Sequence, residues 1–356
     1  MGTVSDRGDP LVAADPPRRT RATVYDVAAA AGVSIKTVSR VVNGGLSVTP
    51  ATRQRVLDAV QAMSYVPNGA ARSLRAGVGD TIGLIVDSIA DPWFATVTAA
   101  VEERALAAGM SVVIGSTGRD AGRLQGLVAR LMQQRVRGLI LAPLGSEGSY
   151  LAGAMHDHPV VCIDRRSDVQ GLDGVRVADR PAARLGVAHL IAHGHRRIAF
   201  LGDGIDVSTI KLREQGYRDA LRHCAIEPDE EIIIRGSGEI GSADAAFTAL
   251  VAARPDITAA FASNPRAGVG LVQALHRTGR TDIAMVSFGD FPLAAAVQPA
   301  VTVIDQDPRP IGLRAAELLL ARIDGGQQPA QDIKLPIRLI VRGSGELAPL
   351  AAGSDR

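Results

Sequence analysis

The feature that most constrains the fold is a regular alternation of short apolar runs and helical stretches that begins at Thr81. The runs are rich in Val, Ile and Leu and show no strict polar alternation, which indicates strands covered on both faces. Such strands belong to a parallel sheet with right-handed crossover helices. In the first part of this region we expect strands at 81–87, 110–116, 138–143 and 159–164, and helices at 93–108 and 123–134.

The same alternation is then repeated, so the region contains two doubly wound sheets in series. It predicts a helix at 181–192 that is stopped by Gly194, strands at 197–202, 231–236, 258–263 and 283–289, a helix at 308–323 and a strand around 334–340. Ligands of such sheets bind at the carboxyl ends of the strands. We therefore expect a ligand cleft between two α/β lobes.

Length and composition restrict the remaining possibilities. A chain of 356 residues, 46% of them hydrophobic, can form two or three units with packed cores. It has no run of about 18 apolar residues that would span a membrane. The first 22 residues carry Asp and Pro where a signal peptide needs an apolar stretch, so we expect a disordered arm on a cytoplasmic protein. Cys162 and Cys224 are expected to be free thiols.

A short helical region at 23–66 precedes the two lobes. Thr23 and Asp26 can form a capping box at the start of a first helix, and Gly32 can supply the positive φ of a tight turn. Ser34 can cap a second helix, and Thr49 before a proline begins a third. The residues expected to pack between these helices are Val27, Ala28, Ala31, Val33, Val38, Val41, Val56, Val60 and Met63. The pattern predicts an all-α helix-turn-helix domain.

This first segment is strongly basic, although the net charge of the whole chain is only +2. Between Arg18 and Arg75, nine Lys and Arg residues face only two Asp residues. Such a segment is typical of a polyanion-binding region, and a solvated basic face would have the same composition. In a helix-turn-helix, the first turn of the second helix enters the major groove, which would bring Ile35 and Lys36 to the base edges. Arg40, one turn later, can pair with guanine.

The run VYDVAAAAGVSIKTVSRVVN, followed by TPATRQRVLDAVQAMSYVPNGAARSLRAG, resembles the lac repressor (LacI/GalR) family of bacterial transcription regulators. The resemblance extends from residue 23 to about residue 347, and the body is also similar to periplasmic sugar-binding proteins. It implies a repressor that binds double-stranded operator DNA as a homodimer. A small-molecule effector, possibly a sugar, would control its operator affinity. It implies no enzymatic activity, no cofactor, no metal and no membrane.

The resemblance implies a division of the chain into five parts. These are a disordered arm at 1–22, the helix-turn-helix at 23–66, a hinge helix and linker at 67–79, an effector-binding and dimerisation domain at 80–346 and a disordered tail at 347–356. Within the large domain, one lobe takes about 80–178 and 307–335, and the other takes about 179–306 and 336–346.

The hinge is expected to become helical only on the operator, because a helix this short does not persist alone. Leu74 matches the family's leucine that wedges between base pairs in the minor groove. A passive linker is the alternative. The expected DNA contacts are Thr23, Tyr25, Ser34, Ile35, Lys36, Thr37, Ser39, Arg40, Asn43, Asn68, Arg72, Leu74 and Arg75.

Effector contacts in the family lie on loops at strand ends. Arg213 matches the family's effector-binding arginine, and a surface ion pair with Glu214 or Asp219 is the alternative. Trp93 or Phe94 could stack on a sugar or base ring, or both are core aromatics at a helix start. The expected effector contacts are Asp91, Trp93, Phe94, Asp164, Arg213, Asn264 and Asp290.

Two departures from the family pattern affect this cleft. After the strand IAMVSF the family commonly has two acidic residues, whereas this chain has Gly289 and Asp290. After Asn264 the family often has Asp, and this chain has Pro265. The acidic constellation that binds polyols is therefore incomplete, which puts a simple hexose effector in doubt.

Other classes of protein are less well supported. A transport receptor predicts a secretion signal and no helix-turn-helix. For an α/β enzyme, the GDG sequence after the strand at 197–202 is a poor dinucleotide fingerprint, and no catalytic triad stands out. His189, His193 and His195 cluster without an evident acidic partner, so we expect plain structure there. The C-terminal sequence GELAPLAAGSDR has no leucine heptads, so we expect a dimer and not a tetramer.

Overall fold

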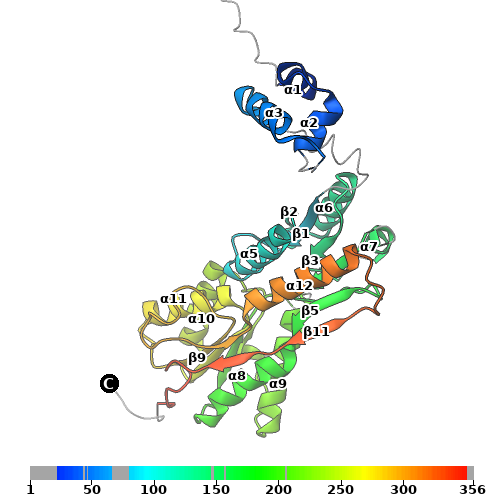
Figure 1. The fold of residues 1–356 in the computed structure, drawn as a ribbon. Helices are drawn as coiled ribbons and strands as arrows, with labels where there is room; N and C mark the ends of the chain where they lie inside the picture. Colours follow the sequence, from blue (N-terminus) through cyan, green and yellow to red (C-terminus); the bar gives the residue numbers. More distant parts are fainter. Residues whose placement is uncertain are drawn as a thin grey trace, which may run out of the picture. The chain divides into compact units, whose positions relative to one another are not determined.

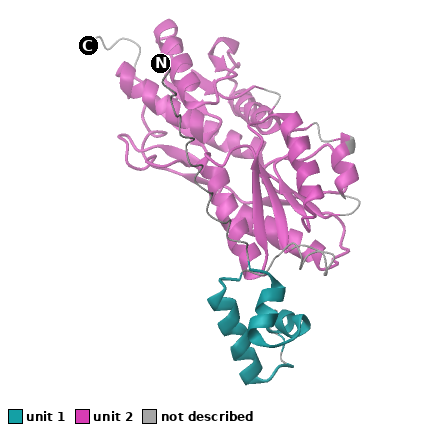
Figure 2. Ribbon diagram, turned by 90° about the horizontal axis from the view of Figure 1, so that it is seen from above, with its two compact units in different colours: residues 1–77 teal, residues 78–356 magenta. Residues whose placement is uncertain are grey.

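The computed structural model describes residues 22–42, 45, 47–65, 80–145, 148–155, 158–204 and 207–350. The chain forms two compact units, residues 1–77 and 78–356, here called the head and the body (Figure 2). Among the described residues, no helix has both the length and the apolar character needed to cross a membrane.

The described part of the head contains three helices, α1 (Val24–Ala31), α2 (Ile35–Val42) and α3 (Pro50–Ala62) (Figure 1). The predicted capping box is confirmed, since the Thr23 side chain accepts from the Asp26 backbone and the Asp26 carboxylate accepts from the Thr23 backbone at 2.7 Å. Gly32 ends α1 with φ at +63°, as the turn requires. The backbone N–H of Thr37 donates to Ser34 Oγ at 3.2 Å, which starts α2. The helix-turn-helix therefore follows from local signals.

The head has a small core of side chains from all three helices. Its buried members are Val27, Ala28, Ala31, Val38, Val41, Val56 and Ala59, with Val33 and Val60 packed against them. Met63 was expected in this core, and that prediction is wrong. It is the C-cap of α3 and is 36% exposed, while Ala59, one turn earlier, is buried.

The first lobe of the body is an all-parallel six-stranded sheet in the order β11-β5-β4-β3-β1-β2. Its strands are β1 (Thr81–Val86), β2 (Ser111–Ser116), β3 (Leu139–Leu141), β4 (Val160–Ile163), β5 (Asp173–Val177) and β11 (Asp332–Leu335). Its helices are α5 (Pro92–Ala107), α6 (Ala121–Gln133), α7 (Gly148–Met155) and α12 (Pro308–Ile323), which packs on α5 and the sheet (Figure 1).

The second lobe has a six-stranded sheet in the order β12-β10-β9-β8-β6-β7, in which only β12 is antiparallel. Its strands are β6 (Ile198–Leu201), β7 (Ile233–Ile234), β8 (Ala259–Ala262), β9 (Ala284–Phe288), β10 (Thr302–Asp305) and β12 (Arg338–Ile340). Its helices are α8 (Asp179–Ala192), α9 (Ser208–His223), the 3-10 turn η1 (Glu230–Ile232), α10 (Ile240–Ala253) and α11 (Pro265–Thr278). The predicted fold class, a helical head and two doubly wound lobes, is confirmed.

Several predicted strands differ from the observed ones. The single strand expected around 334–340 is two strands, β11 and β12, which belong to different lobes. Pro336 lies between them and lacks a backbone donor, so it interrupts the ladder where the chain crosses over. The strand expected at 231–236 shortens to Ile233–Ile234, because Asp229 caps a 3-10 turn ahead of it. β5 and β10 were not predicted. In β5, buried and half-buried residues alternate, so it has no continuous apolar run.

Candidate functional site

The predicted DNA-contacting residues of the head surround the exposed side of α2 and the start of α1. Thr23, Tyr25, Ser34, Lys36 and Arg40 are exposed, with Tyr25 at 69%. Three others, Ile35, Thr37 and Ser39, are half-buried. The remaining predicted contacts, Asn43, Asn68, Arg72, Leu74 and Arg75, lie outside the described residues.

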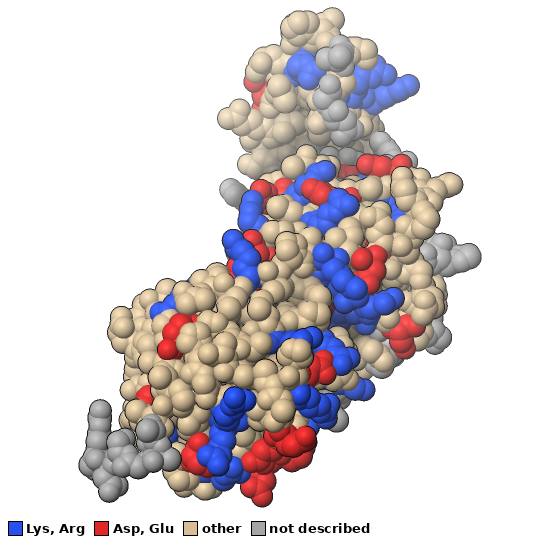
Figure 3. Space-filling model, turned by 90° about the horizontal axis from the view of Figure 1, so that it is seen from below, with Lys and Arg blue, Asp and Glu red and all other residues tan. Residues whose placement is uncertain are grey.

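The described part of the head presents more positive than negative charge, and Figure 3 shows basic side chains on one of its faces. Of its two carboxylates, Asp26 is engaged at the start of α1, where hydrogen bonds from Thr23 lower its pKa. Asp58 accepts from Gln54 Nε2 at 2.8 Å. The four basic residues of the described head are Lys36, Arg40, Arg53 and Arg55. An exposed basic helix of this kind suits a phosphate backbone and base edges.

In the body, polar side chains from both lobes meet at the carboxyl ends of the parallel strands. A cavity of about 50 Å³, here called the inner chamber, lies among them. Six of the seven predicted effector residues line it: Asp91, Trp93, Phe94, Asp164, Arg213 and Asn264. The other lining residues are Asp87, Arg119, Arg165, Asp203, Val207, Thr209, Ile210, Pro265 and Arg266.

In the first lobe, Asp87 at the end of β1 organises the charged groups of the chamber. Its carboxylate accepts from Arg165 Nη2 at 2.6 Å and from Arg119 Nε at 3.3 Å. Arg165 Nε in turn lies 3.2 Å from Asp164 Oδ2. Burial raises the pKa of Asp164 to about 6 in spite of the neighbouring arginines Arg165 and Arg213. Asp164 is therefore a half-buried carboxylate whose protonation can change near pH 6.

Among the residues that the structure describes, two ionic contacts join the lobes across the cleft. Arg119 Nη1, from the loop after β2, lies 2.7 Å from Asp203 Oδ2, which follows β6 in the other lobe. Arg266 Nε on α11 lies 3.8 Å from Asp91 Oδ2 at the start of α5. Asn264 Nδ2 donates to the same Asp203 oxygen at 3.1 Å. A ligand between the lobes must act on these contacts.

Arg213 is buried on α9, with its guanidinium held in place on three sides. Its Nε donates to Asp179 Oδ1 at 2.7 Å and its Nη1 to the Ser263 carbonyl at 2.8 Å. The guanidinium carbon also lies 3.8 Å from the centre of the Phe288 ring. The alternative of a surface ion pair is wrong, because Glu214 pairs with Arg218 and Arg235 and Asp219 pairs with Arg180.

The two aromatic residues at the start of α5 have different environments. Phe94 is buried in the core of the body, as the core alternative held. Trp93 is half-buried and packs edge-on against Phe94, with ring centroids 4.9 Å apart. Its indole Nε1 is buried and has no hydrogen-bond partner among the described residues. A buried donor without a partner is costly, so Trp93 offers a ligand both a ring face and a hydrogen bond.

Asp290 does not line the inner chamber. Its carboxylate accepts a hydrogen bond from Arg342 Nη1 at 2.8 Å. Partial burial acts to raise the pKa of Asp290, but hydrogen bonding to the carboxylate opposes this effect, and the pKa is lowered. Gly289 and Pro265, the two residues that differ from the family pattern, lie against each other. A Cβ at Gly289, whose φ is +90°, would lie 2.6 Å from Pro265 Cγ. The proline therefore fills the space that an acidic side chain would need.

Sequence reasoning missed five charged residues that organise the cleft: Asp87, Arg119, Arg165, Asp203 and Arg266. A usable signal existed for the two aspartates, because each lies within two residues of the end of a buried strand, and the carboxyl ends of parallel strands converge on the ligand. The GDG sequence at 202–204 is a poor dinucleotide fingerprint, and its aspartate, Asp203, is a cleft carboxylate.

The histidine cluster has an acidic partner that the sequence did not reveal. His189 Nε2 contacts Glu346 Oε1, and His195 Nε2 lies 2.8 Å from the Leu347 carbonyl oxygen. These contacts attach the C-terminal segment to α8 and to the residues that follow it. Within the described residues, no three His, Cys, Asp or Glu side chains are arranged to hold a metal ion.

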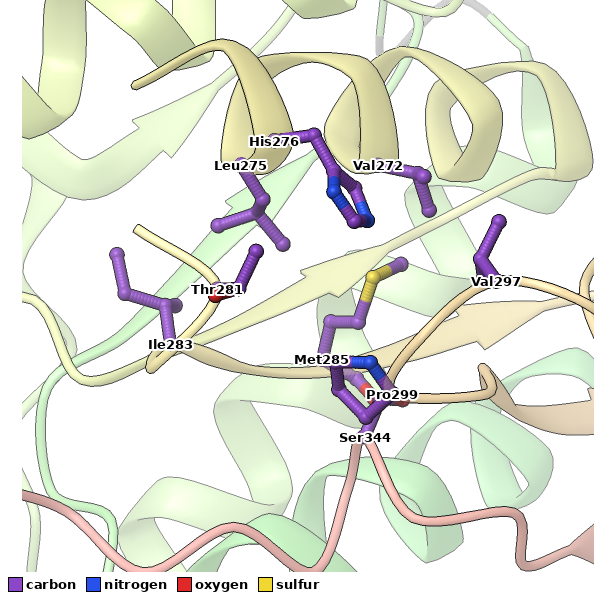
Figure 4. Close-up of a pocket in the computed structure, with 9 residues that line it drawn as sticks. All are labelled: Val272, Leu275, His276, Thr281, Ile283, Met285, Val297, Pro299 and Ser344. Atoms are coloured by element: carbon purple, nitrogen blue, oxygen red, sulfur yellow. The ribbon is translucent and has the colours of Figure 1, made fainter. Parts of the chain in front are cut away.

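A separate cavity lies between α11 and β9 (Figure 4). Its lining is mostly apolar, with Val272 and His276 on the helix and Met285 on the strand. Its volume of about 10 Å³ accommodates roughly one water molecule. It is too small for a metabolite, so the cleft between the lobes is the better effector site.

A helix-turn-helix joined to a two-lobed α/β body with a polar cleft defines the class of ligand-responsive transcription regulators. Comparison with known proteins agrees with this. Residues 23–68 match the family model of bacterial regulatory proteins of the lacI family, and residues 187–345 match a periplasmic binding protein-like domain. The transcriptional regulator CelR of Thermobifida fusca is 33% identical over 341 residues, which cover 92% of this chain and 99% of CelR. The chain therefore belongs to the lacI family of HTH-type transcriptional regulators.

Solved structures show the same relationship. A structure of the lac repressor dimer bound to operator and the anti-inducer ONPF has a TM-score of 0.80 and 29% identity, covering 92% of this chain and all of that one. A complex of CelR with cellobiose has a TM-score of 0.68 and 31% identity, covering 91% of this chain and all of that one.

Proposed function

We propose that this regulator is a repressor that binds its operator as a homodimer and changes operator affinity when a sugar-like effector binds between the lobes. The observation that carries the proposal is the inner chamber, where carboxylates, guanidinium groups and the Trp93 indole from two lobes converge. Charged hydrogen-bonding groups beside an aromatic face are what a polyhydroxylated ring requires. The complex of the related CelR with cellobiose supports this effector class.

The two lobes give the effector a means of control. Asp91, Trp93 and Asp164 come from the first lobe, and Arg213 and Asn264 come from the second. A ligand that touches both lobes binds one arrangement of the lobes better than another, and this difference is what a switch requires.

DNA binding is assigned to the helix-turn-helix at 23–66 and the hinge at 67–79, in the bacterial cytoplasm. Lys36 and Arg40, on the exposed side of α2, are proposed to read bases, with Asn43 and the hinge residues Asn68, Arg72, Leu74 and Arg75 as further contacts. The lac repressor dimer bound to operator supports this assignment.

The body offers a surface for a second copy of the chain. β2 lies at one edge of its sheet, and its Val113 and Ile114 are 38% and 44% exposed. An exposed apolar edge strand requires cover, which supports dimerisation through residues 80–346. Sedimentation at micromolar protein is expected to show a dimer, and a tetramer would contradict the proposal.

One experiment tests the DNA-binding and effector parts together. The purified protein is used to select duplexes from a random DNA pool, and the selected site is then bound in the presence of a panel of neutral sugars. The expected result is a pseudopalindromic site with half-sites about one helical turn apart, whose binding at least one sugar changes. Selection of no common sequence would overturn the assignment of the head. A site that no sugar affects would overturn the assignment of the cleft.

A further inference from the structure

The cleft continues beyond the inner chamber into a second cavity of about 320 Å³, here called the outer chamber. The residues that line the outer chamber are Arg119, Ala121, Leu144, Arg165, Asp203, Gly204, Val207 and Ser208. Four of them, Arg119, Arg165, Asp203 and Val207, also line the inner chamber. The Arg119–Asp203 ion pair therefore belongs to the wall between two parts of one cleft.

The two sides of this wall differ in how firmly they are held. Asp203 is buried, Asn264 donates to it, and a Cβ at Gly238 would lie only 1.7 Å from its Oδ1. The carboxylate thus fills the space that a side chain at residue 238 would take. Arg119 comes from a loop and its side chain is 28% exposed. Opening the wall therefore requires Arg119 to move while Asp203 stays in place.

A hydroxyl group is the neutral group best suited to enter this ion pair. It accepts a hydrogen bond from a guanidinium and at the same time donates one to a carboxylate. Both Arg119 and Asp203 then keep a partner, so neither charge is left unsatisfied in the cleft. A ligand group that only donates hydrogen bonds would leave Arg119 without a partner in the pair, and a group that only accepts them would leave Asp203 without one.

The sizes of the chambers indicate how large the ligand is. Ligand pockets usually enclose about 300–1,000 Å³, a range that the outer chamber reaches and the inner chamber does not. A single ring beside Trp93 would need the wall to open and would leave the outer chamber filled with solvent. A second ring placed there adds contacts with both lobes.

We infer that the effector is a neutral oligosaccharide of at least two rings. One ring lies beside Trp93 and Arg213, the next occupies the outer chamber, and a hydroxyl enters the Arg119–Asp203 pair. This inference rests on the proposed function and extends it, because it assigns the outer chamber as a subsite and excludes a monosaccharide as the full effector.

The test fills the outer chamber from either lobe. Ala121 and Ser208 are the exposed first residues of α6 and α9, and Ala121→Phe and Ser208→Phe each place a ring in the chamber. Ala129→Phe is the matched control, since Ala129 is exposed on α6 and lines neither chamber. Calorimetric titrations of the full-length protein compare cellobiose and maltose with glucose, and lactose with galactose. Circular dichroism checks the fold of each variant.

The expected result is that at least one disaccharide binds about tenfold or more tightly than its monosaccharide, and that each filled variant loses about tenfold in that affinity. The Ala129→Phe control should retain it. Equal affinity for a monosaccharide and its disaccharide, or full disaccharide affinity in both filled variants, would overturn the inference while leaving sugar control intact. Failure of all these sugars to bind would overturn both the inference and the sugar part of the proposed function.

Discussion

The head and the cleft of the body place their functional side chains in opposite environments. On the head, Lys36 and Arg40 are exposed on a helix whose core is made by other residues. In the cleft, Arg213 is buried, Asp164 is half-buried, and both are held by neighbouring charged groups. Substitutions on the head should therefore change DNA binding without changing stability. Substitutions in the cleft should change stability and effector binding together.

Among substitutions in the head and the cleft, we expect the largest loss of stability at Arg213. Arg213→Ala leaves the Asp179 carboxylate buried without its guanidinium, which should lower the free energy of unfolding by about 3–5 kcal/mol. The control is Arg180→Ala, which removes the exposed pair with Asp219 and should leave the free energy of unfolding almost unchanged. Urea unfolding followed by the fluorescence of Trp93, the single tryptophan, measures both. Equal costs at the two sites would show that the cleft charges do not support the fold.

Asp164 should make the free energy of unfolding depend on pH. Burial raises its folded pKa from 3.8 to about 6, so between these values the folded protein binds more protons than the unfolded chain. The contribution of this carboxyl group to the free energy of unfolding therefore falls as pH rises through that window. Asp164→Asn removes the dependence, and the stability of the variant relative to wild type should rise by about 2 kcal/mol between pH 4 and 7.

Urea unfolding of both proteins across this range checks the prediction for Asp164. The groups that act on its carboxyl are Arg165, Arg213, Asp179 and Asp87, and all are retained in the variant. A stability difference that stays constant with pH would contradict the assignment.

Arg40 tests whether an exposed residue of the head affects DNA binding without affecting stability. Arg40→Ala should cost about 1–3 kcal/mol in binding to the selected operator and relax base preference at one position of each half-site. Its unfolding midpoint should match that of wild type, because the side chain is exposed. Arg55→Ala on α3 is the control, and any loss should be equal on operator and random DNA. Loss of stability in Arg40→Ala would contradict the separation of function from fold on the head.

The smallest effect is expected at Asp290. It lies outside the inner chamber and pairs with Arg342, so Asp290→Ala should cost less than about 1 kcal/mol in stability and leave sugar affinity unchanged. Calorimetric titration with the sugar that binds wild type most tightly checks this. A loss of sugar affinity as large as that of a cleft variant would show that Asp290 contacts the effector.

The sequence predicts what local chemistry determines and misses what long-range packing determines. The Thr23–Asp26 capping box and the Gly32 turn could be anticipated from a few adjacent residues. The pairing of Arg119 with Asp203 could not, because the two residues are far apart in the chain and meet only when the two lobes face each other. The same holds for Arg213, whose partner Asp179 begins a different helix.

The sequence also does not show that two residues that differ from the family pattern contact each other. In the sequence, Gly289 and Pro265 each indicate the loss of an acidic group, whereas in the fold the proline packs against the glycine and a side chain at residue 289 would clash with it. The cleft carboxylates come instead from other strand ends, at Asp87 and Asp203. An incomplete family motif therefore does not mean an incomplete polar site.

If an effector in the cleft controls DNA binding by the head, operator binding must change when it is titrated with the most tightly bound sugar. Fluorescence anisotropy should show that wild type changes its operator Kd by about 5–150-fold at saturating sugar. Trp93→Ala, which removes the ring and donor of the inner chamber, should lose this response and keep its sugar-free Kd within about threefold of wild type, a change below 1 kcal/mol. A Trp93→Ala variant that responds to the sugar as wild type does would contradict the account.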